Sequence, residues 1–265
     1  MEPTEVTIVI PVYRPQLTAD ERLSIGHNVA CLHRYPVVLL APEGMPLDDV
    51  LTAFPEDRMP EVMTVGEEWL GAKNGIAGYN RMMLSAEFYD RFSQSSYLLV
   101  CQPDVWIFRD ELADWCREGY DYVGAPWIRR PVYDLPVVRH YLALRRWWAD
   151  RRGVRLRQHC FERVGNGGLS LRHVVRFGSA CRRYAAEIEA CLSHPGHLHN
   201  EDVFWALVPR GFRYPDAQRA LDFAFDTNPA ACLKRTGGRL PFGCHGWTKA
   251  RYRTFWQRFI PCEPR

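Results

Sequence analysis

Four short segments of the chain contain residues whose types and spacing could support chemistry: Asp104, the glycine cluster at 165–168, the pair Glu201 and Asp202, and His245. Carboxylates, imidazoles and exposed backbone amides bind cations, bind phosphates or move protons. Each segment also has a purely structural explanation. The choice between the two depends on the helices and strands that position the segments.

Asp104 follows an apolar run at 98–101 that is typical of a buried strand, with Gln102 and Pro103 between them. Ligands of open α/β sheets bind beyond the carboxyl ends of the strands, where a carboxylate could hold a divalent cation that bridges phosphates. An aspartate that completes a turn after Pro103 is the alternative. A paired acidic motif would have a second carboxylate at position 106, but the chain has Trp106 there.

The cluster Gly165-Asn166-Gly167-Gly168 could let the backbone approach a ligand and present its N–H groups. It lacks the lysine of the phosphate loop and the spacing of the dinucleotide fingerprint. A tight turn is therefore a sufficient explanation of the cluster taken alone.

Asn200, Glu201 and Asp202 precede an apolar run, which predicts a helix that Asn200 caps and whose first turn is acidic. The functional alternative is that one of the two carboxylates is a general base for a hydroxyl. The neighbouring His194, His197 and His199 give only a weak indication of a metal site. His245 lies between Gly243 and Gly246, and it could be an accessible imidazole or a structural histidine.

The elements around these segments predict an α/β fold. Apolar runs without polar alternation at 7–12, 37–40, 97–101 and 122–125 are typical of strands covered on both faces, and 63–65 could be a further strand. The spacing predicts helices at 20–33, 78–91, 111–117 and 174–192. Alternation of strands and helices predicts a wound, mainly parallel sheet with flanking helices.

A segment rich in arginine interrupts this alternation. Residues 128–157 contain nine arginines and two acids, and the stretch RHYLALRRWWADRR predicts an inserted helix within 128–160. A solvated helix face, a bound anion and an acidic membrane surface are the three interpretations. Trp147 and Trp148 could pack inward, cover a substrate or touch a membrane.

The bulk properties limit the remaining choices. The chain has 265 residues and a net charge of only +3, so a nucleic-acid partner is not expected. We expect one domain over 1–265 that ends in a basic helix at 248–265. The chain has nine cysteines and no C-x-x-C pair, the N-terminus does not resemble a secretory signal, and no run is long enough to span a membrane, so we expect a cytoplasmic protein.

Taken in order, four stretches resemble a family of mostly bacterial proteins that is catalogued as a domain of unknown function and classed with GT-A glycosyltransferases. They are YLLVCQPDVWIFRDELADWCREGYDYVGAPW, VGNGGLSLR, NEDVFWAL and PFGCHGW, and the resemblance covers about residues 69–247. It implies a GT-A-like, Rossmann-like fold. It also implies transfer of a sugar from a nucleotide-diphosphate sugar to an acceptor hydroxyl, as in polysaccharide biosynthesis.

The resemblance assigns roles to individual residues. Asp202 corresponds to the base of inverting enzymes and Glu201 is its neighbour in the catalytic pair. Asp104 matches the first aspartate of the Asp-x-Asp metal motif, and His245 lies where a third metal ligand is common. The implied donor-binding residues are Pro11, Tyr13, Gln102, Asp104, Asn166, Gly167 and Gly168.

Trp106 is the departure from the family pattern. Without the second aspartate, the ligand set for Mn²⁺ or Mg²⁺ would be Asp104 and His245, so a divalent metal is an open expectation. Alternatively, Arg129, Arg130 or Arg172 could neutralise the diphosphate without a metal.

Three other functions stay open at this point. They are a retaining glycosyltransferase, a sugar nucleotidyltransferase on the same scaffold, and a module that binds a nucleotide sugar or glycan without catalysis. The acceptor is expected to be a glycan or a glycolipid. The basic insert also suggests peripheral contact with the inner face of a membrane.

Overall fold

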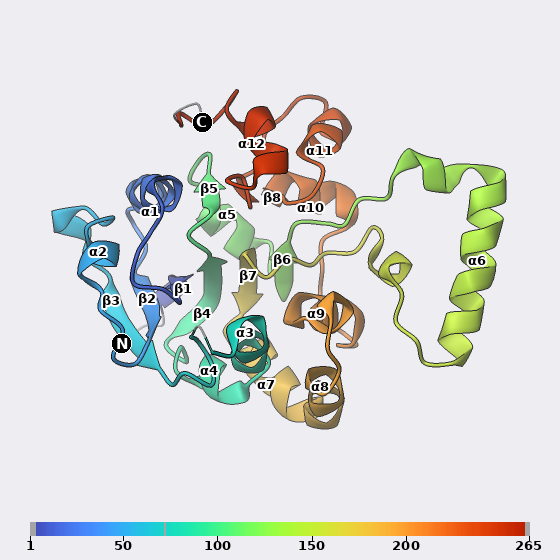
Figure 1. Ribbon diagram of the computed structural model, residues 1–265, viewed down its shortest axis with the longest axis horizontal. Coiled ribbons are helices and arrows are strands. Elements are labelled where there is room, and N and C mark those ends of the chain that lie inside the picture. Colours follow the sequence, from blue (N-terminus) through green and yellow to red (C-terminus); the bar gives the residue numbers. More distant parts are fainter. Residues whose placement is uncertain (1–3, 72, 263–265) are drawn as a thin grey trace.

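The computed structural model describes residues 4–71 and 73–262, and a six-stranded sheet lies at its centre (Figure 1). The strand order is β3-β2-β1-β4-β7-β6. The strands are β1 (Thr4–Pro11), β2 (Val37–Pro42), β3 (Glu61–Val65), β4 (Ser95–Cys101), β6 (Tyr122–Gly124) and β7 (Leu169–His173). Strands β1 to β4 run parallel to one another, whereas β7 is antiparallel to both β4 and β6. The predicted mixed, mainly parallel sheet is confirmed.

Both faces of the sheet are apolar because alternate residues of a strand point to opposite sides. In β4, Leu99 packs in one core cluster, whereas Leu98 and Val100 pack in the other. In β1, Ile8 and Val9 divide in the same way. Such strands require helices on both sides, as in other parallel sheets.

Helices supply these two layers. On one face lie α1 (Ala19–Cys31), α5 (Leu112–Arg117) and α10 (Ala217–Phe223). On the other lie α3 (Gly75–Met83), α4 (Ala86–Asp90), α7 (Val174–Arg183), α8 (Ala185–Leu192) and α9 (Glu201–Leu207). The short helix α2 (Asp48–Leu51) follows β2, and α11 (Pro229–Arg235) follows β8 (Ala224–Phe225).

Two predicted helices are each divided in the structure. The predicted helix at 78–91 is α3 and α4. The first ends at Met83, and Ser85 caps the second by accepting a hydrogen bond from the amide of Phe88 at 3.1 Å. The predicted helix at 174–192 is α7 and α8, with Tyr184 at the joint. Apolar spacing continues across both joints, so the pattern gave no sign of the breaks.

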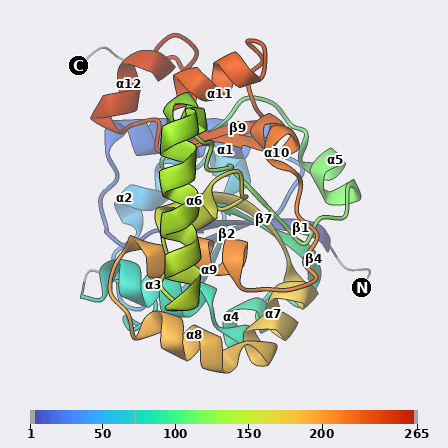
Figure 2. The same cartoon turned by 90° about the vertical axis from the view of Figure 1, so that its right-hand side faces the viewer.

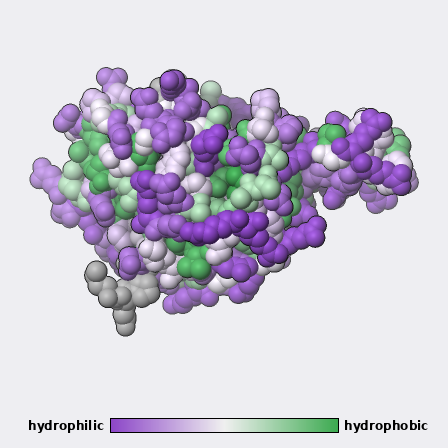
Figure 3. Space-filling model, turned by 90° about the horizontal axis from the view of Figure 1, so that it is seen from below, coloured by the Kyte–Doolittle hydropathy of each residue, from purple (hydrophilic) through white to green (hydrophobic). Residues whose placement is uncertain are grey.

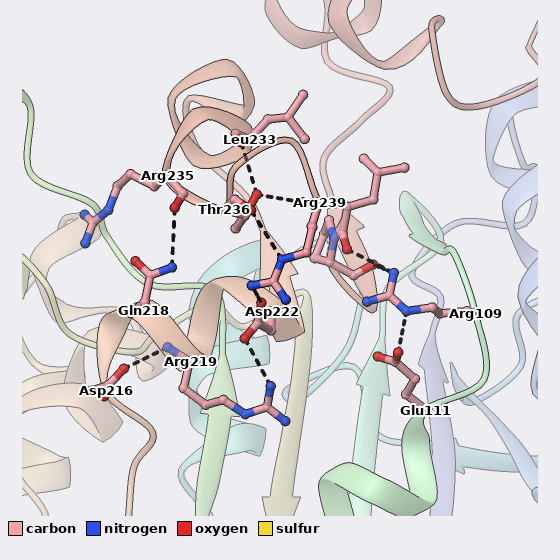
Figure 4. A network of polar contacts seen from close by, with 12 residues as sticks. Arg109, Glu111, Asp216, Gln218, Arg219, Asp222, Leu233, Arg235, Thr236 and Arg239 are labelled. Atoms are coloured by element: carbon pink, nitrogen blue, oxygen red, sulfur yellow. Dashed lines mark hydrogen bonds and ion pairs between the residues drawn. The ribbon is translucent and has the colours of Figure 1, made fainter.

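A second, three-stranded sheet lies beside the carboxyl end of β4. Its strand order is β5 (Val105–Ile107), β9 (Gly243–His245), β8, with β9 antiparallel to β5 and parallel to β8. Polar contacts fix its outer side (Figure 4). Arg109 Nη1 donates to the carbonyl of Leu240 at 2.9 Å, and Asp222 accepts from both Arg219 and Arg239 at 3.0 and 3.3 Å.

The C-terminal helix is shorter than predicted for 248–265. It is α12 (Ala250–Trp256), and the chain leaves the helical conformation after it; residues 263–265 lie outside the described part. Arg253 pairs with Asp20 of α1, and the indole of Trp247 donates to Ser24 at 2.9 Å. These contacts dock the helix on its own fold.

The arginine-rich insert contains α6 (Pro136–Arg151), which stands apart from the body of the protein in Figure 1 and lies on the side that faces the viewer in Figure 2. Among residues 4–71 and 73–262, no helix has the length and apolar character needed to cross a bilayer. All nine cysteines are free thiols, and seven of them are buried.

Candidate functional site

A cleft of about 390 Å³ opens at the carboxyl ends of β1 and β4, within the size range of small-molecule sites. Its wall contains four of the residues expected to bind a donor: Pro11, Tyr13, Gln102 and Asp104. The first turns of α3 form the opposite wall. The parallel pairing of β1 and β4 brings these two strand ends together.

The side chains of Gln102, Asp104 and His245 converge at the mouth of this cleft. Nε2 of His245 lies 3.3 Å from Oδ1 of Asp104 and 3.2 Å from Oε1 of Gln102. The second sheet causes this approach, because Val105 of β5 is in register with His245 of β9 and the amide of Gly246 donates to the carbonyl of Asp104 at 3.0 Å.

Asp226 completes this group and was not predicted from the sequence. It follows β8, whose register with β9 brings it beside His245, with Oδ1 3.2 Å from Nδ1 of the imidazole. Nothing in the local sequence FDTNP distinguishes this aspartate from a turn residue. Only the pairing of β8 with β9 could have identified it.

The two carboxylates hold the imidazole in its charged form when no metal is bound. Burial alone would lower the pKa of His245, but Asp104 and Asp226 outweigh it and raise the pKa to about 9. Burial would likewise raise the pKa of Asp104, yet the charge and hydrogen bond of His245 hold it below its ordinary value. His245 then donates from both nitrogens.

These three side chains could also hold a divalent cation. Neighbouring ligands in an octahedral site are separated by about 3 Å, given metal–ligand bonds of about 2.1 Å. The spacings of 3.2 and 3.3 Å around Nε2 meet this requirement. Within the described residues, no three His, Cys, Asp or Glu side chains are grouped to hold a metal, so the amide oxygen of Gln102 would be the third donor.

Trp106, the residue in place of a second aspartate, lies in the core and not in the site. It is 3% exposed and stacks on His27 with 3.8 Å between ring centroids. In β5, Val105 is in register with His245 and Trp106 with Cys244, so the side chain of Trp106 lies on the face of this sheet opposite to His245. The position therefore could not supply a ligand in this backbone arrangement.

The glycine cluster forms a wall between the cleft and the start of α9, and its glycines allow close contacts. A Cβ atom on Gly168 would lie 2.3 Å from the imidazole of His245, and one on Gly167 would lie 2.3 Å from Oε1 of Glu201. The side chain of Asn166 is buried and accepts from the amide of Gly168 at 2.8 Å. The structure thus brings Gly168 next to His245 and Gly167 next to Glu201.

Asp202 lies in the first turn of α9 and is partly exposed. Burial of its surroundings is the main cause that raises the pKa of Asp202 to about 7, and the adjacent Glu201 and Asp226 carboxylates add to it. A carboxylate with this pKa is suited to accept a proton at neutral pH.

Glu201 is 2% exposed and its side chain points away from solvent. Its Oε1 accepts from Arg172 Nη2 at 3.0 Å, and Arg172 also donates to Tyr89 at 3.1 Å. The backbone amide of Glu201 donates to Asn80, which in turn donates to Asn200, so the Asn200 side chain does not cap the helix. This contact network fastens α9 to the sheet and to α3.

The arginines proposed as a substitute for the metal are in other positions. Arg172 is fully buried beneath the site and cannot contact a diphosphate. Arg129 pairs with Asp134. Two other cations are near the cleft: Arg14 lines it, and Lys249 is close enough for its charge to contribute to the lowered pKa of Asp104. Neither was predicted from the sequence.

The loop histidines do not form a metal group. His194 and His199 stack with 5.0 Å between ring centroids and line a separate cavity between α3 and α8. Burial is the main cause that lowers the pKa of His199, which keeps it neutral.

Three solved structures that are similar to this chain are glycosyltransferases. The galactosyltransferase LgtC, solved with donor and acceptor sugar analogs, superposes with a TM-score of 0.58 at 12% identity over 97% of both chains. Mouse xyloside xylosyltransferase 1 superposes with a TM-score of 0.52 at 12% identity, over 94% of this chain and 98% of that one. The core-mannan synthase A of Aspergillus fumigatus, in an Mn/GDP form, superposes with a TM-score of 0.50 at 11% identity, over 77% of this chain and 70% of that one.

At these identities the comparison establishes the GT-A fold and no more. No curated protein matches the chain in sequence. The family model described as "Protein of unknown function (DUF5672)" matches residues 60–245, which is more than half of the chain. The predicted GT-A-like architecture is confirmed, and this chain belongs to the DUF5672 family.

Proposed function

We propose that the chain is a glycosyltransferase whose catalytic domain spans residues 1–265. It transfers a sugar from a nucleotide-diphosphate donor to an acceptor hydroxyl with inversion. The observation that supports the proposal is the convergence of Gln102, Asp104 and His245 at the mouth of the strand-end cleft. Asp202 is close enough to this group for the charge of Asp226 to contribute to its raised pKa.

The nucleoside would occupy the cleft. Tyr13 is 54% exposed and Ile76 is 62% exposed, so both offer apolar surface on which a nucleobase can stack. Tyr79 lies deeper, with its hydroxyl 3.2 Å from the carbonyl of Gly167. This arrangement directs the diphosphate toward Asp104.

Gln102, Asp104 and His245 would hold a Mn²⁺ or Mg²⁺ ion at this end of the cleft. The ion would neutralise the diphosphate as its charge develops. Asp226 would orient the imidazole so that Nε2 faces the ion, since a carboxylate partner on the other ring nitrogen fixes the tautomer. Arg14 and Lys249 would add positive charge nearby.

Asp202 would take the proton from the acceptor hydroxyl. The acceptor oxygen then forms a bond to the anomeric carbon while the bond from that carbon to the phosphate oxygen breaks, and its electron pair leaves with the diphosphate. A single displacement of this kind inverts the anomeric configuration. Glu201 would position Asp202 through the Arg172 contact and is not expected to touch the substrate.

The experiment is a thermal-shift screen of nucleotide sugars with and without Mn²⁺, followed by a transfer assay with the donor that binds. A donor should raise the melting temperature, because a ligand that binds only the folded state stabilises it. Asp202→Asn should retain this shift and lose at least about 100-fold in transfer rate. Asp90→Asn, at an exposed ion pair on α4, is the matched control.

The other outcomes identify the alternatives. Equal loss of donor binding and transfer in Asp202→Asn would mean that Asp202 is structural or binds the donor. A product with retained configuration would exclude direct displacement. Release of diphosphate from a nucleoside triphosphate, as its nucleotidyl group is transferred to a sugar phosphate, would identify a nucleotidyltransferase. Donor binding without turnover across an acceptor panel would identify a binding module.

A further inference from the structure

The helix α6 has an apolar stripe that faces solvent. Val137, Tyr141, Leu144 and Trp148 follow one another at intervals of four, three and four residues, so they share one side of the helix. They are 83, 62, 66 and 47% exposed, and the neighbouring Trp147 is 52% exposed. Large apolar side chains are rarely exposed in such a row on a soluble surface.

A different side of α6 attaches the helix to the protein. Ala149 is buried, Val138 and Leu142 are half-buried, and Gln158 donates to the carbonyl of Leu142 at 3.2 Å. His159 also contacts Asp150 at 3.0 Å. Because these contacts fix the rotation of the helix, the stripe of Val137, Tyr141, Leu144 and Trp148 is directed outward.

Positive charge flanks this stripe. Arg145 and Arg152 follow Tyr141 and Trp148 by four residues, and within the described part of the chain neither has an ion pair with a carboxylate. Arg152 lies over the ring of Trp148 at 3.8 Å, and Arg151 lies over Trp147 at 4.2 Å. Figure 3 shows the arm as a projection whose apolar surface is interleaved with hydrophilic surface.

We infer that α6 is a docking arm for an anionic lipid bilayer, with the stripe inserted among the acyl chains and the arginines at the headgroups. Tryptophan and tyrosine favour the membrane interface, and long basic side chains reach from an inserted helix to anionic headgroups. The same charges oppose a second copy of the chain as the occupant, since two such helices would bring arginines together.

The arm joins the body beside the candidate site. At its base the backbone amide of Trp127 donates to the carbonyl of Arg163 at 3.0 Å, and the ring of Trp127 covers Gly165. The base of the arm therefore contacts the glycine cluster of the candidate site. The docking itself does not depend on the proposed transfer reaction.

Flotation of the 265-residue protein with vesicles tests this inference. The protein should float with vesicles that contain about one-third phosphatidylglycerol in phosphatidylcholine, and less so at high salt. It should not float with phosphatidylcholine alone. The double variant Leu144→Ser/Trp148→Ser should lower the partition coefficient at least about tenfold, because it removes apolar area from the inserted face.

Two further variants make the test specific. Arg145→Gln/Arg152→Gln should weaken binding to anionic vesicles while leaving the apolar stripe intact. Val175→Ser removes an apolar side chain that is 63% exposed on α7, away from the arm, and should bind as the unmodified protein does. All these positions are exposed, so melting temperatures should agree within error.

Three results would overturn the inference. They are absence of wild-type flotation, equal binding to neutral and anionic vesicles, and binding that neither double variant reduces. A dimer in sedimentation velocity that Leu144→Ser/Trp148→Ser abolishes, without any vesicle binding, would identify a second copy as the occupant.

Discussion

His245 and Asp226 face each other across the end of the β8–β9 pair, with Nδ1 of the imidazole 3.2 Å from Oδ1 of the carboxylate. An ionised carboxylate can only accept, so Nδ1 carries the proton. The other ring nitrogen is therefore directed at Gln102 and Asp104. The contact orients the imidazole from behind, as outer partners of metal-binding histidines do.

Asp226→Ala should weaken Mn²⁺ binding by about 10- to 100-fold, because the imidazole loses the partner that sets its tautomer and orientation. The midpoint of a Mn²⁺-dependent thermal shift measures this change. Asp114→Ala, which removes an exposed carboxylate on α5, should leave the midpoint where it was. An unchanged midpoint in Asp226→Ala would mean that His245 does not bind the ion.

Transfer should depend on pH through Asp202. Its pKa of about 7 results from burial and from Glu201 and Asp226, opposed by Arg172 and the amide of Val203. Because a base must be ionised, kcat should fall about tenfold per pH unit below about 7. Measurement of kcat at saturating donor gives the profile. A rate that stays level through this range would exclude Asp202 as the base.

Ionisation of Asp202 should lower the free energy of unfolding at neutral pH. Its folded pKa of about 7 lies above the unfolded value of about 3.9, so the folded state binds more protons and its stability falls as pH rises between the two. Asp202→Asn should therefore stabilise the protein by about 1–2 kcal/mol near pH 8, after screening by solvent, and by less near pH 5. Chemical denaturation at both pH values measures the difference. A gain that does not depend on pH would contradict this explanation.

Gly168→Ala should disrupt the site while leaving the fold in place. The added Cβ would lie 2.3 Å from the imidazole of His245, so the ring must move away from Asp104 and Gln102. Mn²⁺ binding should fall at least about tenfold, as expected when a ligand is displaced. Gly178→Ala in α7 meets only ordinary contacts and is the control. Retention of full Mn²⁺ affinity by Gly168→Ala would show that the imidazole position is not critical.

Glu201→Gln should destabilise the protein by about 3–5 kcal/mol, because Arg172 would keep a buried charge without its partner. Urea unfolding measures the loss. The same change at an exposed pair, Glu87→Gln beside Arg91, should cost less than about 1 kcal/mol. Loss of activity at unchanged stability would instead indicate that Glu201 acts on the substrate.

Local pattern was sufficient for most elements of the fold. Strands β1, β2 and β4 follow continuous apolar runs, and such runs can be satisfied only between two layers of helices. The helix breaks at Ser85 and Tyr184 were missed because apolar spacing continues through them. The length of α12 was also overestimated, since its basic pattern extends past the point where the helix ends.

Only part of the candidate site could be predicted from the sequence. The sequence by itself determined that Asp104 follows a buried strand, that a glycine cluster precedes β7, and that Asp202 opens a helix, because these depend on residues close together in the chain. Only the tertiary structure decided that Asp226 orients His245, that Trp106 lies in the core and that Arg172 is buried under Glu201. Those relationships join residues that are far apart in the chain. Strand register sets the first two, and the packing of α9 against β7 sets the third.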